Sequence, residues 1–150
     1  MSAGAGNAVA VIDPRGQRFA AALTTLVLAT VLLTGSAWLL LAQTAVFAVG
    51  VLAGPARTPY AWLYRTALRP RLGPPREMED AAPPRFAQLC GLLFGALGLI
   101  GVALGASLLT TVAVALALGA AFLNAAFGFC LGCEIYLLAR RAGIRLPLST

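Results

Sequence analysis

The chain has 150 residues, of which 60% are hydrophobic and only 11% are charged. A soluble domain is on average about 45–50% apolar and about 25% charged, and a small domain leaves much of its surface in water. The composition therefore excludes an ordinary water-soluble enzyme and a disordered chain, and it predicts a protein whose solvent is the lipid bilayer.

The basic excess is carried by arginine alone, and the formal charge is +6 with no histidine in the chain. Without histidine, Ser–His and Cys–His catalysis and His-ligated metal sites are excluded. In a membrane protein, arginine marks the cytoplasmic side. We therefore expect no nucleic acid as a partner, because such binding needs an exposed basic face on a soluble domain.

Two long segments contain no charged residue, Phe19–Ala56 and Phe86–Cys133. A spanning helix needs about 20 apolar residues, so each segment has room for two. Small residues interrupt each segment near its middle, namely Thr34-Gly35-Ser36 and Gly105-Ala106-Ser107. A cleaved signal peptide fits the first segment less well, because a second apolar stretch follows at once. We predict an all-α, polytopic membrane protein with four transmembrane helices, at Phe19–Thr34, Ala37–Gly54, Phe86–Gly105 and Leu108–Phe129.

These four helices form two tandem helical hairpins within a single membrane domain. The hairpins occupy residues 1–54, with the N-terminal segment, and 86–133; residues 55–85 form a cytoplasmic or interfacial loop, and 134–150 form a tail. The charged residues all fall outside the spans and on one face of this arrangement. The positive-inside rule puts that face in the cytoplasm, so we expect a bacterial inner-membrane protein with both termini cytoplasmic.

The two halves resemble one another. The triplet Arg18-Phe19-Ala20 opens the first hairpin, and Arg85-Phe86-Ala87 opens the second. A repeat of two helices would insert in the same orientation both times, which gives a parallel repeat about an axis along the membrane normal. A chance match between two apolar sequences is the alternative.

The loop between the hairpins predicts an interfacial amphipathic helix. Apolar and aromatic residues recur there at helical spacing: Tyr60, Leu63, Tyr64, Ala67 and Leu68. Arg65 and Arg69 lie four residues apart on another stripe, and Arg71 follows. Aromatic side chains and arginine are typical of a helix lying at the headgroups. Whether these arginines bind lipid or a cytoplasmic partner is left open.

The cysteines carry the strongest chemical signal. Cys130 and Cys133 form a C-x-x-C motif, in which Cys130 would attack and Cys133 would resolve. If the helix breaks at Gly128, Cys130 begins a new helix whose N–H groups favour a thiolate; if it continues, the dipole opposes one. Cys90 lies near the cytoplasmic start of the third helix and could assist. The alternative is that the cysteines only pack, as small apolar residues do. The ligands are too few for a metal site, and we expect none.

Two polar residues fall within the predicted spans, Asn124 and Gln43. Polar side chains at membrane depth hydrogen-bond across helices, so we expect these two to be partners. Glycines recur every three or four residues along the third helix, which predicts that it packs closely on a neighbour. These are Gly91, Gly95, Gly98 and Gly101.

The segment from Leu123 to Glu134, with Pro14-Arg15 and Pro84-Arg85-Phe86, resembles the bacterial membrane proteins catalogued as domain of unknown function 4395. The resemblance covers nearly the whole chain. It implies a four-helix inner-membrane protein of undefined activity, and by association it points to a thioredoxin-like or sulfurtransferase protein as partner. We expect no cofactor. We therefore weigh two hypotheses: a membrane partner in thiol–disulfide or sulfur transfer, or a non-enzymatic scaffold with structural cysteines. A homodimer fits either, because four short helices expose much surface to lipid.

Overall fold

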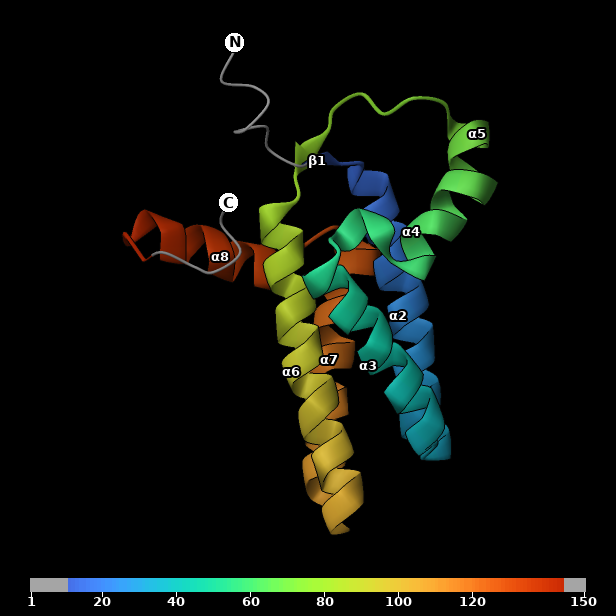
Figure 1. The fold of residues 1–150 in the computed structure, drawn as a ribbon, viewed down its shortest axis with the longest axis vertical. Helices are drawn as coiled ribbons and strands as arrows, with labels where there is room; N and C mark the ends of the chain where they lie inside the picture. The colour runs from blue at the N-terminus through green and yellow to red at the C-terminus, as the bar shows by residue number, and fades with distance from the viewer. Residues whose placement is uncertain (1–10, 145–150) are drawn as a thin grey trace.

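The computed structural model describes residues 11–144 and is built almost entirely of helices (Figure 1). Three of them, α2 (Pro14–Thr34), α6 (Ala82–Leu104) and α7 (Ser107–Phe127), are long and apolar enough to cross a membrane. A fourth, α3 (Ala37–Leu52), is apolar but has 16 residues. The all-α prediction is confirmed, and three helices have the length and hydropathy of a membrane span.

The long helices begin earlier than predicted. The side chain of Asp13 accepts a hydrogen bond from the backbone N–H of Arg15, and Pro14 occupies the first helical position, so α2 starts five residues before Phe19. Proline is also present in the first turn of α6. Proline suits both helix starts for the same reason. The N–H groups of a first turn have no partner within the helix, so no hydrogen bond is lost where proline lacks one.

The turns between consecutive helices lie where the small residues predicted them. Gly35 ends α2 with φ 71°, and Gly105 ends α6 with φ 70°. Only glycine adopts this left-handed conformation without steric cost. Both turns lie at one end of the molecule (Figure 1). The charged segments gather toward the other end, around β1, α5 and α8.

The segment between α3 and α6 is largely helical. A 3₁₀ turn (Pro55–Arg57) precedes α4 (Pro59–Leu63), a π-helical turn (Tyr64–Leu68) and α5 (Arg69–Leu72). The last three adjoin one another, so the expected helix is present over residues 59–72 with a π-helical turn at its centre. Two-residue strands β1 (Val11–Ile12) and β2 (Glu79–Asp80) then pair antiparallel, which ties the end of this segment to the start of α2.

The helices pack mainly across the two halves. Helix α2 packs along α7, and α3 packs along α6, while α6 also contacts α7. The buried core lies at these contacts and consists of Leu28, Val31, Leu40, Val114 and Ala117. The glycines of α6 allow the close approach that the sequence predicted: a Cβ at Gly91 would lie 2.6 Å from the ring of Phe47 in α3.

An arginine from each half caps a helix of the other half. Arg18 in α2 donates to the carbonyl oxygen of Ala125 at 3.1 Å, in the last turn of α7. Arg85 in α6 donates to the carbonyl oxygen of Val51 at 2.6 Å, in the last turn of α3. Both satisfy carbonyl groups that a helix end leaves without partners. These reciprocal contacts agree with the predicted repeat, in which the two arginines are equivalent.

The aromatic residues that follow the arginines repeat the pattern. The ring of Phe19 packs on Tyr64 with centroids 5.9 Å apart, and Phe86 packs on Tyr136 at 5.8 Å. Both tyrosines are buried. Each half thus holds the segment that follows its second helix against the start of its first helix, through one phenylalanine–tyrosine contact.

Candidate functional site

Helix α7 (Ser107–Phe127) ends at Gly128 and does not continue to the cysteines, which answers the question of helix continuity that the sequence left open. Gly128 takes φ 69° and its N–H bonds the carbonyl oxygen of Asn124 at 2.9 Å, so α7 ends at Phe127. A new helix, α8 (Leu131–Arg141), then starts beside α6 and projects to one side of the bundle, crosswise to the long helices (Figure 1). Cys130 is its N-cap residue.

Cys130 and Cys133 form a disulfide with their Cα atoms 5.1 Å apart. The backbone N–H of Cys133 also donates to the sulfur of Cys130 at 3.2 Å, so this sulfur caps the helix as a serine oxygen would. Both residues are half-buried. The N-terminus of an eleven-residue helix carries a partial positive charge, which favours the thiolate that reduction would release.

The first turn of α2 lies against this disulfide. The side-chain amide nitrogen of Gln17 donates to the sulfur of Cys133 at 3.5 Å. Its neighbour Arg18 holds the end of α7, and its guanidinium would lie 3.7 Å from a Cβ placed on Gly128. The sequence analysis missed both contacts. The repeat marked Arg18 as notable, but nothing marked Gln17, which lies 116 positions from its partner.

Close packing of α8 on α6 fixes the position of the disulfide. A Cβ at Gly132, between the two cysteines, would lie 2.7 Å from the Cα of Ala87. A backbone atom cannot move aside as a flexible side chain can. Gly132 therefore acts here through its lack of a side chain, which lets the first turn of α8 lie directly on α6.

Two hollows meet at Cys130. The first, which we call the interhelical cavity, has a volume of about 280 Å³, and its lining includes Cys90, Asn124 and Cys130. The second, the outer groove, has a volume of about 480 Å³ and reaches both disulfide cysteines. Gln17, Asn124 and Cys130 line both hollows. The outer groove also carries charged side chains, namely Arg18, Glu79, Asp80 and Glu134.

The structure therefore brings several of the predicted site residues to one place. Cys90 is a free, half-buried cysteine in α6 that shares the interhelical cavity with Cys130. Arg65 and Arg69 line the same cavity, and Arg65 also donates to the carbonyl of Ala56. Arg71 is exposed and lines neither hollow. Within residues 11–144, no three His, Cys, Asp or Glu side chains are grouped to hold a metal ion.

Gln43 does not pair with Asn124, so that expectation is wrong. Gln43 is 1% exposed, and its side chain accepts a hydrogen bond from the hydroxyl of Tyr60 at 2.6 Å. Its amide nitrogen donates to Thr24 at 3.5 Å. A tyrosine from the connecting segment reaches into the bundle and satisfies Gln43, and Asn124 lies instead between the two hollows.

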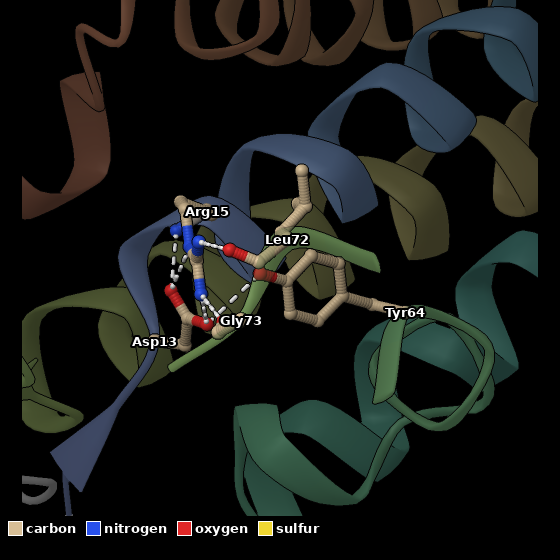
Figure 2. A network of polar contacts seen from close by, with 5 residues as sticks. All are labelled: Asp13, Arg15, Tyr64, Leu72 and Gly73. Atoms are coloured by element: carbon tan, nitrogen blue, oxygen red, sulfur yellow. Dashed lines mark hydrogen bonds and ion pairs between the residues drawn. The ribbon is translucent and has the colours of Figure 1, made fainter. Parts of the chain in front are cut away.

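A second polar cluster lies at the start of α2 (Figure 2). The hydroxyl of Tyr64 donates to the carboxylate of Asp13 at 2.9 Å, and Arg15 donates to the same carboxylate at 3.1 Å. Arg15 also donates to the carbonyl oxygen of Gly73 at 2.9 Å. Burial acts to raise the pKa of Asp13, but the hydrogen bonds from Arg15 and Tyr64 outweigh it and hold the pKa below 3.8. This cluster ties the segment after α3 to α2.

Comparison with known proteins gives one finding on the relationship of this chain. No curated protein and no solved structure matches it significantly. Residues 12–141 match the family described as Domain of unknown function (DUF4395). That match covers every long helix, including the break at Gly128 and the disulfide. The chain belongs to this family.

Proposed function

We propose that the chain is a membrane-bound thiol–disulfide exchange protein that acts through Cys130 and Cys133. The observation that carries this proposal is the disulfide at the N-terminus of α8, with the sulfur of Cys130 as the helix cap. A cysteine in that position has its thiolate stabilised and its thiol acidified, as the nucleophiles of C-x-x-C motifs have. The half-buried pair opens to the outer groove, where a second protein could reach it.

The proposal includes four spans, with α3 as the fourth. Sixteen helical residues are about 24 Å long, which is shorter than a hydrocarbon core of about 30 Å. A short span is accommodated by local thinning of the bilayer. Its exposed residues are as apolar as a lipid-facing surface requires, and they include Trp38, Leu41 and Leu52.

The proposed partner is a soluble, cytoplasmic dithiol protein, thioredoxin-like or a sulfurtransferase. The charged segments lie toward the end of the molecule that carries α8. From the positive-inside rule we infer that the disulfide and both termini face the cytoplasm and that the membrane is the bacterial inner membrane. The outer groove offers both signs of charge, from Arg18 and Glu134, beside the disulfide. A partner with complementary charge would be oriented there before exchange.

Trapping the partner tests this proposal. With Cys133→Ser, the attack of Cys130 on a partner disulfide cannot be resolved, so a mixed disulfide should accumulate and be identified by mass spectrometry. The matched control is Cys90→Ser alone, which leaves the C-x-x-C intact and should trap nothing. If Cys133→Ser captures no dithiol protein from the cytoplasm in intact cells, the exchange function is wrong.

A scaffold at the membrane surface is the second candidate function. It is favoured by the segment after α3, where Trp62, Leu63 and Leu72 are exposed beside Arg65 and Arg71. Apolar side chains flanked by arginine are typical of a helix at the headgroups. A large maleimide separates the two functions: an exchange disulfide is labelled in membranes only after reduction under native conditions, whereas a structural disulfide resists the reductant until the chain unfolds.

A further inference from the structure

The amide of Gln17 is the one side-chain donor that contacts a disulfide sulfur among residues 11–144, at 3.5 Å from Cys133. The two sulfurs are therefore unlike. The sulfur of Cys130 receives a backbone N–H from the first turn of α8, and the sulfur of Cys133 receives a side chain from α2. A backbone donor is present in any helix of this kind, but a side-chain donor is supplied by a residue that a substitution can remove.

We propose that Gln17 is a positioning residue that stabilises Cys133 as the leaving thiolate when the disulfide is attacked. The inference rests on the proposed exchange function and assigns the roles of the two cysteines within it. The partner thiolate attacks the sulfur of Cys130, the Cys130–Cys133 bond breaks, and its electron pair leaves on Cys133. The amide of Gln17 then faces an anion instead of a neutral sulfur, and a hydrogen bond to a charged group is roughly twice as strong.

The exchange is completed by the partner itself. Its second thiol loses a proton and attacks the partner sulfur of the mixed disulfide, which releases Cys130 as a thiolate. The partner dithiol becomes a disulfide, and Cys130 and Cys133 take up the two electrons and two protons. Since a better leaving group departs faster, the contact with Gln17 raises both the rate of attack and the equilibrium tendency of the pair to be reduced.

Reduction of the full-length protein by dithiothreitol in detergent measures both quantities without any partner protein. We expect Gln17→Ala to lower the equilibrium constant for reduction about tenfold, which is about 30 mV for a two-electron couple. Gln17→Glu retains the shape of the side chain but replaces the donor by a carboxylate, so its effect should be larger. Gln88→Ala is the matched control, because Gln88 in α6 makes no hydrogen bond to either sulfur within the described chain.

The order of the variants distinguishes an electrostatic role from packing. A purely structural Gln17 would tolerate glutamate better than alanine, which reverses the expected order. The proposal is overturned if Gln17→Glu is reduced as readily as the unsubstituted chain, or if Gln88→Ala shifts the equilibrium as far as Gln17→Ala. Because dithiothreitol replaces the partner, a chain that traps no protein in cells can still show the Gln17 effect, so failure of the exchange function is recognised separately.

Discussion

The two halves of the molecule place a helical segment against the start of a long helix, but they do so with different chemistry. In the first half, Tyr64 packs on Phe19 and its hydroxyl donates to Asp13, so a half-buried carboxylate completes the contact. In the second half, Tyr136 packs on Phe86, and α8 lies on α6 through Gly132. We call these the first corner and the second corner. Equivalent frameworks thus support a polar anchor at one corner and a disulfide at the other.

The second corner should be the more sensitive of the two to an added methyl group. A Cβ at Gly132 would meet the backbone of Ala87 at 2.7 Å, whereas one at Gly16 would meet the ring of Tyr64 at 3.0 Å. A ring can shift and a helix backbone cannot. We expect Gly132→Ala to cost about 1–3 kcal/mol and Gly16→Ala less than half of that. Thermal unfolding in detergent measures both.

The control for this pair is Gly119→Ala in α7, where a Cβ would meet nothing within 4 Å. Alanine is favoured over glycine in a helix interior by about 1 kcal/mol, so this variant should be slightly stabilised. Equal losses at Gly132 and Gly16 would contradict the comparison, because they would show that both corners yield alike.

The first corner should depend on pH and on the charge of Asp13. Its side chain is 8% exposed, and its pKa is held below 3.8 in the folded chain. A lowered pKa stabilises the fold above the unfolded value, and this contribution is lost as the pH falls through the folded value. Asp13→Asn still caps α2 but lacks the charge, so we expect a loss of about 1.5–3 kcal/mol at neutral pH.

The measurement is the unfolding midpoint of both chains from pH 6 down to about pH 2. The advantage of the unsubstituted chain over Asp13→Asn should be constant at the upper end of this range and should shrink once the pH falls below 3.8, because Asp13 is then protonated first in the unfolded chain and, at lower pH, in the folded chain. A constant difference across this range would show that the carboxylate contributes by shape and not by charge.

The sequence was sufficient for what depends on composition and on local backbone rules. Charge-free segments predicted the long apolar helices, and small residues predicted the turns at Gly35 and Gly105, because only glycine reaches those φ values cheaply. The start of α2 was predicted too late because its charged first turn was assigned to a loop, although Asp13 and Pro14 together are a helix start signal.

Contacts between distant residues could not be read in the same way. Gln43 was assigned to Asn124 because both lie within apolar segments, yet its partner Tyr60 comes from the connecting segment. Gln17 carries no local signal at all, since a single glutamine near the start of a helix is ordinary. The sequence allowed the helix either to continue through Gly128 or to end there, because glycine adopts both helical and left-handed φ values.

The smallest expected effects concern the two arginine caps, Arg18 and Arg85. Each donates to a carbonyl group in the last turn of a helix, but only one of the two lies beside the disulfide. Arg18→Gln and Arg85→Gln each remove a charge from a helix C-terminus, which should cost about 0.3–1 kcal/mol in either case. Only Arg18 lines the outer groove beside the disulfide. A cation near a departing thiolate stabilises it, so Arg18→Gln should slow reduction by dithiothreitol about threefold and Arg85→Gln should leave the rate unchanged. If both variants slow reduction equally, the caps act through helix stability alone, and the second corner owes its chemistry to Gln17 and the α8 N-terminus.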